Sequence, residues 1–268
     1  MNDIPVLNVK GKTLPETWEK AVLLTWKKGL KIKTEYDKPE DPESRDATMI
    51  MVIDEPMSEP RIHRAFPAGL EDLEIYRQEV VYGIHDHWIC PEEGKWTYTY
   101  HQRLFSYPNE KSTLDQISYI VDKISKVPYS RRAQAITWIA GLDPKTDDPP
   151  CLQRVWCRLS RYKNSWILNM NTHWRSRDAY KAAFMNIFAL TDLQKTIAKR
   201  IQENICESVS VGRYVDISDS FHIYGSYFKD FEKFLTTVKT RTWEERTWGT
   251  EFAEPIFEEA RKKIEREK

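Results

Sequence analysis

The sequence predicts an α+β fold. Segments whose apolar residues have helical spacing alternate irregularly with shorter runs that are typical of strands. Two of these runs are joined by the polar turn Arg161–Asn164, which predicts an antiparallel hairpin. No Gly/Ser-rich or Pro-rich linker divides the 268 residues, so we expect one domain over residues 1–268.

In the first half of the chain, apolar residues at helical spacing predict three helices. They are expected over residues 15–28, 70–83 and 114–124. The charged, turn-rich segment 37–47 predicts a surface loop, and the apolar run 49–53 that follows it predicts a buried strand.

The second half of the chain contains most of the predicted sheet. Its strands are expected over residues 133–140, 153–159, 166–172 and 209–223. The longest helix is expected over residues 178–203, because its apolar residues follow one stripe along the whole segment. A further helix is expected over residues 230–239, and the charged, amphipathic segment 252–268 predicts a peripheral helix at the C-terminal end.

The composition argues against whole classes of partner. The 41 basic and 41 acidic residues cancel, so no overall charge favours DNA or an anionic membrane. No apolar run approaches the 18 residues or more that span a bilayer, and the N-terminal segment lacks the basic and then hydrophobic plan of a signal peptide. We therefore expect a cytoplasmic protein.

One of the four cysteines has the features of a nucleophile. The four cysteines show no Cys-x-x-Cys spacing and no disulfide framework, and Cys157 and Cys206 lie in patterns typical of packed apolar groups. Cys151 differs because Pro149 and Pro150 stiffen its approach. Arg175 follows downstream, and a guanidinium close to a thiol lowers its pKa. This combination predicts covalent catalysis by Cys151.

Five short motifs occur in a fixed order. They are Ser130-Arg131-Arg132, Pro149-Pro150-Cys151, Arg175-Ser176-Arg177-Asp178, Asn186 and His222-Ile223-Tyr224. Their order and spacing resemble the thymidylate synthase family, and the surrounding residues look closer to its archaeal-type members. The match extends over residues 125–232 and implies a large twisted mixed sheet with packed helices.

The resemblance implies a set of catalytic residues. Cys151 matches the nucleophile that adds to carbon 6 of dUMP, and Arg175 matches the arginine that activates it. Asn186 can donate to a pyrimidine carbonyl and accept from ring nitrogen 3, which is the pattern that reads uracil. Glu79 matches the glutamate that handles protons at the pyrimidine oxygen, and Tyr100 matches the active-site tyrosine.

The resemblance also implies a nucleotide-binding set and a homodimer. Arg131 and Arg132 match arginines that reach the phosphate in the neighbouring subunit, whereas Arg45 matches a mobile phosphate-binding arginine. Ser176 completes the phosphate set. His222 and Tyr224, two residues apart on one face of a strand, match the pair that hydrogen-bonds the sugar hydroxyl.

The implied co-substrate is 5,10-methylenetetrahydrofolate or an archaeal tetrahydropterin analogue. Asp178 and Trp88 are the expected contacts with this reduced pterin. The chain departs from the family in having Leu152 where a histidine usually follows the cysteine. It also has a charged terminal segment over residues 265–268 in place of the apolar tail that closes over the folate. The sequence therefore leaves methylation of dUMP and hydroxymethylation of dUMP or (d)CMP both open.

The sequence also contains features of two other classes of function. His85, His87 and Cys90 have the residue types and spacing of a partial zinc site, but a fourth ligand is not evident. A non-catalytic family member that binds a nucleotide or RNA is the other alternative.

Overall fold

The computed structural model describes residues 3–109 and 112–267. Residues 1, 2, 110, 111 and 268, which the expected domain and terminal helix include, lie outside the described residues. The helices are α1 (Leu14–Lys28), α2 (Leu70–Tyr82), α3 (Tyr100–Phe105), α4 (Gln116–Lys126), α5 (Ala183–Ile205), α6 (Phe228–Thr240), α7 (Trp243–Arg246) and α8 (Thr250–Glu267). The strands are β1 (Val6–Gly11), β2 (Leu30–Ile32), β3 (Ser44–Ile53), β4 (Ile62–His63), β5 (Tyr107–Asn109), β6 (Ser112–Leu114), β7 (Gln134–Ile136), β8 (Leu152–Tyr162), β9 (Ser165–Trp174), β10 (Arg177–Asp178), β11 (Val209–Ile223) and β12 (Thr247–Trp248).

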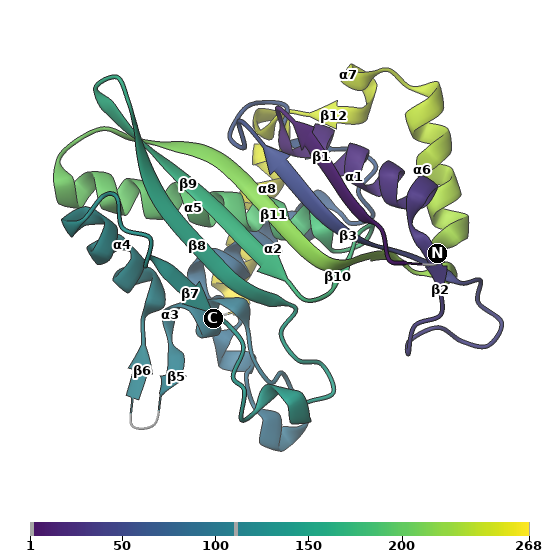
Figure 1. Ribbon diagram of the computed structural model, residues 1–268, viewed down its shortest axis with the longest axis horizontal. Coiled ribbons are helices and arrows are strands. Elements are labelled where there is room, and N and C mark those ends of the chain that lie inside the picture. The colour runs from purple at the N-terminus through teal and green to yellow at the C-terminus, as the bar shows by residue number, and fades with distance from the viewer. Residues whose placement is uncertain (1–2, 110–111, 268) are drawn as a thin grey trace.

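A large twisted mixed sheet organises the molecule (Figure 1), and the predicted α+β class is confirmed. In the described part of the chain, its main path runs β1-β3-β11-β9-β8-β7, with β2 on β3 and β10 on β11. Strand β11 pairs with β9 in parallel and with β3 in antiparallel orientation. The predicted hairpin is confirmed, because β8 and β9 are antiparallel and pair as far as Tyr162 opposite Ser165.

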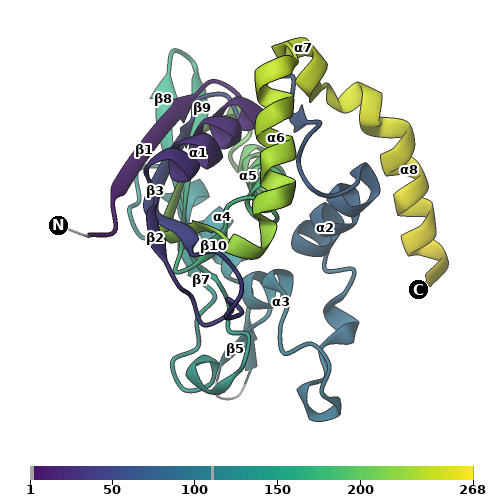
Figure 2. The same cartoon turned by 90° about the vertical axis from the view of Figure 1, so that its right-hand side faces the viewer.

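The helices lie on one side of this sheet (Figure 2). Along β9 every second side chain is buried, from Trp166 to Trp174, whereas the side chains between them are half-buried on the opposite face. The buried face packs against α1 and α5, and helix α2 in turn packs between α5 and α8. The sheet therefore has one face that the helices cover and one that they leave open.

Several predicted boundaries were wrong. The expected loop over residues 37–47 ends earlier, since β3 begins at Ser44, and Arg45 consequently lies in a strand. The expected strand over 133–140 is reduced to β7. The helix expected from residue 114 begins at Gln116, with the carboxylate of Asp115 accepting from the Ser118 amide at its N-terminus.

The longest helix also begins later than predicted, at Ala183 instead of residue 178. Arg177 and Asp178 pair with Phe221 and His222 of β11 in parallel. The Asp178 carboxylate then accepts from the backbone amide of Lys181 at 2.8 Å, which holds the chain in a turn before α5. A local side-chain hydrogen bond and strand pairing thus override the helical periodicity at this point.

Helix α8 is an amphipathic helix that packs against α2, as expected for a peripheral element. Its buried side chains are Ala253, Phe257 and Ala260, and most of the other described side chains are exposed. Arg261 forms an ion pair with the buried Glu74 of α2 at 3.0 Å. Among the described residues, no helix is long and apolar enough to cross a membrane.

Candidate active site

The hairpin β8–β9 brings Cys151 and Arg175 together. Leu152 at the start of β8 pairs with Trp174 at the end of β9, so the residues just outside the hairpin are neighbours. The Arg175 backbone amide donates to the Cys151 carbonyl at 2.9 Å. Its guanidinium donates to the carbonyls of Pro149 and Pro150 at 2.6 and 3.1 Å. Arg175 therefore holds the backbone segment that presents the thiol.

The pKa of the Cys151 thiol is raised, not lowered as the sequence predicted. Burial of the half-buried side chain is the largest cause, and the negative charge of Asp148 adds to it. The positive charges of Arg175 and Arg177 lower the pKa but do not outweigh the burial. In the ligand-free chain the cysteine is accordingly a protonated thiol near neutral pH.

Tyr100 lies next to this thiol. Its hydroxyl accepts a hydrogen bond from the backbone amide of Leu152 at 3.3 Å, and its ring packs edge-on against Trp174 with centroids 5.7 Å apart. Burial raises the pKa of the phenol, with a further contribution from the nearby Cys151. The hydroxyl therefore stays protonated and can donate to a ligand.

A cavity of about 750 Å³ opens beside Tyr100 and contains Glu79 in its wall. The wall is formed by residues of α2, of the segment 91–100 and of the segment 145–148. Trp96 is part of this wall, and Trp88 packs edge to face against it with centroids 5.1 Å apart; both rings are partly exposed. Burial raises the pKa of Glu79, and its hydrogen bond with His85 opposes that shift.

Asn186 lies in the first turn of α5 and is largely buried. Its amide donates to the hydroxyl of Tyr76 at 2.6 Å. The sequence motifs did not predict a role for Tyr76 in the site. Its position three residues before Glu79, which puts both side chains on one face of α2, is the sequence feature that could have indicated this role.

His222 and Tyr224 form a second corner of the site. The expectation that both residues lie in one strand was wrong for Tyr224, because β11 ends at Ile223. The two rings are nevertheless in contact, with centroids 4.5 Å apart. Burial lowers the pKa of His222, so the imidazole is neutral. The carboxylate of Asp178, next to His222 across the strand pairing, has a pKa that burial raises.

The hydrogen bonds around His222 determine its tautomer. The Ser220 hydroxyl lies 2.9 Å from the carboxylate of Asp46 and 3.1 Å from His222 Nδ1. Because a carboxylate can only accept, the hydroxyl donates to Asp46, and Nδ1–H of His222 donates to the hydroxyl. Nε2 is then a bare acceptor, and it is buried without a partner in the described structure.

Arg45 approaches the same corner from β3, where it pairs with Ile223 of β11. Its guanidinium lies 5.4 Å from the centre of the Trp26 ring, and its Nε is buried without a hydrogen-bond partner among the described residues. Ser176 lies half-buried between Arg175 and β10. These two residues therefore lie at the same end of the sheet as Cys151 and His222.

Arg131 and Arg132 do not join this cluster within the chain. Both are exposed, just before the edge strand β7. Their backbone carbonyls accept from Trp156 and Tyr119 at 3.2 and 3.3 Å, which orders the segment. No hydrogen bond or ion pair of either guanidinium is found in the described ranges.

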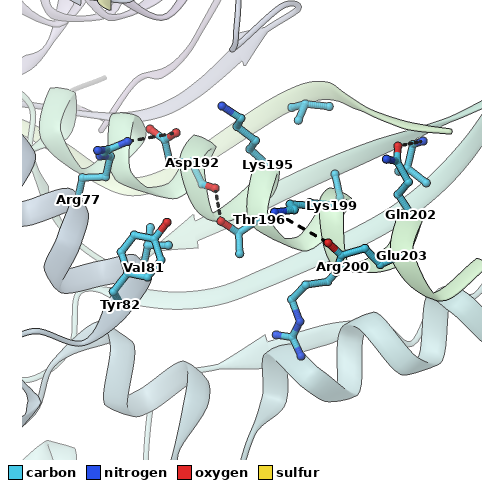
Figure 3. A pocket seen from close by; sticks show the side chains of 13 residues that line it. Arg77, Val81, Tyr82, Asp192, Lys195, Thr196, Lys199, Arg200, Gln202 and Glu203 are labelled. Carbon is cyan, nitrogen blue, oxygen red and sulfur yellow. Dashed lines mark hydrogen bonds and ion pairs between the residues drawn. The ribbon is translucent and has the colours of Figure 1, made fainter. Parts of the chain in front are cut away.

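A second cavity, of about 580 Å³, lies between α2, α5 and the start of β11 and contains none of the predicted site residues (Figure 3). Arg77 points towards Asp192 there at 4.0 Å, and Lys199 lies 3.9 Å from Glu203. Its charges are thus partly paired within the chain. Within residues 3–109 and 112–267, no group of three or more His, Cys, Asp or Glu side chains is placed to hold a metal ion.

The fold and the site together define an α+β protein with a cysteine, an arginine and a neutral histidine gathered at one end of a mixed sheet. The thymidylate synthase family model matches residues 66–247. The chain belongs to the thymidylate synthase family, and the predicted resemblance is confirmed.

Relatives from archaea match most of the chain. A provisionally named thymidylate synthase of Methanocaldococcus jannaschii is 29% identical over 224 residues, which cover 82% of this chain and 91% of that protein. One from Methanosarcina acetivorans is 28% identical over 217 residues, covering 81% and 88%. The structure of the thermostable thymidylate synthase A from Bacillus subtilis matches with a TM-score of 0.59 and 16% identity, covering 81% of this chain and 82% of that one. The last similarity supports the fold.

Proposed function

We propose that the protein is a thymidylate synthase that transfers a one-carbon unit from methylenetetrahydrofolate, or from a related tetrahydropterin, to carbon 5 of dUMP. The observation that carries this proposal is the cluster of Cys151, Arg175, Asn186 and His222 at one end of the sheet. Strand pairing brings Cys151, Arg175 and His222 to this end, and Tyr76 of α2 holds Asn186 of α5. His222 Nε2 and Arg45 Nε in the same region are buried without partners in the described structure. Unpaired buried polar groups are costly, and a bound polar ligand removes that cost.

Cys151 is the proposed nucleophile. Attack of its sulfur at carbon 6 of the uracil forms a C–S bond and moves electron density towards carbon 5 and the carbonyl oxygen at position 4. Because the pKa of the thiol is raised, Cys151 loses its proton as it attacks. The positive charges of Arg175 and Arg177 stabilise the thiolate as it forms.

Asn186 and His222 are the proposed residues that select the nucleotide. The amide of Asn186, held by Tyr76, reads the base edge as uracil. The bare Nε2 of His222 accepts a hydrogen bond from a sugar hydroxyl, next to Tyr224. Arg45 and Ser176 are the proposed phosphate contacts within the chain, since a planar guanidinium can donate two parallel hydrogen bonds to a pair of phosphate oxygens.

The cavity beside Glu79 fits a reduced pterin. Its volume and the exposed faces of Trp88 and Trp96 suit a flat ring system. Asp178, which lies beside His222 and outside this wall, is the proposed polar contact that the family resemblance implies for the pterin ring. The co-substrate would supply the one-carbon unit and, for methylation, the hydride. Glu79 would hold or move a proton at the carbonyl oxygen of the base, and Tyr100 would donate a hydrogen bond beside the thiol.

We also propose a cytoplasmic homodimer. The helices leave one face of the sheet uncovered (Figure 2). That face carries half-buried side chains such as Ile50, Trp156 and Ile167. A second copy of the chain placed against this face would bury them. It would also give the guanidinium groups of Arg131 and Arg132, which have no partner among the described residues, a phosphate to bind in the neighbouring site.

The position of α8 favours hydroxymethylation as the second candidate function. Arg261 and Lys263 tie this helix to Glu74 and Glu71 of α2 at 3.0 and 2.6 Å, so its described part packs on the outer side of α2. An element that closes over the cleft normally excludes water. If water reaches the one-carbon unit first, the product is a hydroxymethyl pyrimidine.

Two measurements test the proposal. Incubation with 5-fluoro-dUMP and methylenetetrahydrofolate should add the mass of both to a peptide containing Cys151, and Cys151→Ala should abolish the adduct while it keeps nucleotide binding. Turnover of dUMP should give dTMP and dihydrofolate, separated by chromatography with mass detection. An unmodified peptide would contradict covalent catalysis. A product heavier than dTMP by one oxygen, without dihydrofolate, would establish hydroxymethylation instead.

A further inference from the structure

Glu79, in the wall of the cavity beside Tyr100, forms a carboxylate–imidazole pair with His85. The Nδ1 atom of His85 lies 3.0 Å from a carboxylate oxygen of Glu79, and the two side chains are 11% and 12% exposed. The pair forms because Gly83 ends α2 in the left-handed conformation, with φ at 65°. A Cβ atom at Gly83 would lie 2.3 Å from His101 Nδ1, so glycine is needed for this reversal.

The imidazole of His85 is held in one orientation. Its ring stacks on Trp88 with centroids 3.7 Å apart and an interplanar angle of 12°. Trp96 packs edge-on against it at 5.7 Å. No hydrogen-bond partner of Nε2 is found in the described part of the chain, and Nε2 is not among the buried polar atoms that lack a partner. The ring thus has one nitrogen on Glu79 and the other open to water.

We propose that His85 is a positioning residue that exchanges a proton with Glu79 and connects it to bulk water. This inference rests on the proposed function and adds a residue to it. With the His85 proton on Nε2, a proton taken up by Glu79 from the cleft crosses the 3.0 Å hydrogen bond to the bare Nδ1. The resulting imidazolium releases its Nε2 proton to solvent, which leaves the Glu79 carboxylate accepting from Nδ1–H. The reverse path restores the first tautomer, because Nε2 takes a proton from water, Nδ1–H passes its proton to Glu79, and Glu79 donates it in the cleft.

The groups around the pair leave this path undisturbed. Asp86 raises the pKa of Glu79, but its own carboxylate is committed to Thr99 and to His101, the latter at 2.6 Å. Tyr76, on the same face of α2, keeps its proton because burial raises its pKa. The other ionisable groups of the cavity wall are Lys95, Tyr98, Tyr100, Lys145, Asp147 and Asp148. Within the described residues, none of these groups lies within hydrogen-bond distance of Glu79, whereas His85 does.

The first experiment separates the proton step from the addition of the thiol. Release of tritium from [5-³H]dUMP reports loss of the carbon 5 proton, whereas trapping by 5-fluoro-dUMP reports attack by Cys151. His85→Gln can still donate a hydrogen bond to Glu79 but cannot relay a proton, so tritium release should fall by about 100-fold while trapping continues. The lower limb of the pH profile of kcat should also disappear. Added imidazole should restore part of the rate.

His87→Gln is the matched control, because His87 is exposed and makes no hydrogen bond to Glu79 in the described structure; it should keep wild-type tritium release. His85→Phe keeps a flat ring against Trp88 and loses both nitrogens. Its tritium release should therefore be as slow as that of His85→Gln. Wild-type kcat and an unchanged pH profile in His85→Gln would overturn the inference.

A second measurement needs no substrate. Difference infrared spectroscopy follows the protonated carboxyl band of Glu79, which Glu79→Gln identifies by removing it. Because the hydrogen bond from His85 lowers the pKa of Glu79, the band should persist to higher pH in His85→Phe, which removes that hydrogen bond. An unshifted band would refute the pairing itself. A shifted band in a protein that neither traps 5-fluoro-dUMP nor releases tritium would support the pair and overturn the proposed reaction.

Discussion

Two clusters of charged and polar side chains in this molecule differ in how completely they are paired. In the first, Glu19 of α1 accepts a two-pronged ion pair from Arg246 at 2.8 and 3.0 Å and lies 2.9 Å from Nε2 of the buried His63. In the second, at the end of the sheet, His222 Nε2 and Arg45 Nε are buried without partners in the described structure.

The difference separates a structural site from a binding site. The Glu19 cluster connects α1, β4 and α7 and uses the hydrogen-bonding capacity of its members within the chain. The cluster around His222 leaves that capacity open, and a ligand that brings a hydroxyl and a phosphate would complete it. Substitutions in the first cluster should therefore change stability, and those in the second should change affinity and rate.

The largest expected effect is on the stability of the Glu19 cluster. Glu19→Gln leaves Arg246 largely buried without its countercharge, which should cost about 3 to 5 kcal/mol of unfolding free energy at pH 7. Urea unfolding measures this loss. The affinity of the folded protein for dUMP should not change, and a weakened affinity would break the distinction between the two clusters.

The loss of unfolding free energy in Glu19→Gln should also depend on pH, in a direction that follows from the pKa of Glu19. Burial raises the pKa of Glu19, but its bonds to His63 and Arg246 outweigh burial and lower it overall. A carboxylate with a lowered folded-state pKa stabilises the protein above its unfolded-state pKa, and this contribution is lost as the pH falls through the folded value. The difference between wild type and Glu19→Gln should accordingly shrink below about pH 4.

A smaller effect is expected at the exposed arginines. Arg131→Gln together with Arg132→Gln should weaken dUMP binding by about 10-fold to 100-fold, because each substitution removes charged hydrogen bonds between a guanidinium and the phosphate. Stability should be unaffected, since both side chains are exposed. Calorimetry measures the affinity.

The arginine prediction includes a test of the dimer. At a dUMP concentration too low to fill the sites of this variant, mixing it with inactive Cys151→Ala should restore activity, because a hybrid dimer then contains one site with an intact cysteine and intact partner arginines. Failure of two correctly folded variants to complement would contradict arginine sharing between subunits.

The bare Nε2 of His222 predicts a preference for the 3′-hydroxyl. Wild type should bind dUMP about 10-fold more tightly than 2′,3′-dideoxyuridine monophosphate, which lacks the hydroxyl that donates to Nε2. His222→Phe should bind the two nucleotides alike. Because the readout is a ratio for one protein, a general loss of stability would not imitate it. A preference that survives in His222→Phe would place the sugar contact elsewhere.

The smallest expected effect is on the Cys151 thiol. Asp148 raises its pKa, so Asp148→Asn should lower that pKa and speed alkylation by iodoacetamide near neutral pH. Asp147→Asn is the matched control, because Asp147 lies in the same cavity wall and does not contribute to the shift. The rate of alkylation is measured as a function of pH. An equal effect of the two substitutions would contradict a specific effect of Asp148 on the pKa of the Cys151 thiol.

Periodicity and motifs in the sequence determined the fold class, the β8–β9 hairpin and the family. These features depend on residues close in the chain: alternation along Trp166–Trp174, helical spacing in 70–82 and the short motifs around Cys151. Local spacing was less reliable where a side chain intervened, as at Asp178, whose carboxylate caps a turn where a helix was expected. Strand β2, with three residues, is too short for a periodic signal, and both β1 and β2 depend on their partner β3.

Only the tertiary structure decided how the site is arranged. The register of β11 against β3 and β10 sets His222 beside Asp46 and Asp178, and that surrounding fixes its tautomer. The pairing of Tyr76 with Asn186 joins residues 110 positions apart. The pKa of Cys151 rises because burial outweighs the arginine that the sequence motif places nearby. Burial and long-range neighbours set these properties, and a linear motif carries information about residue types but not about how deeply the fold encloses them.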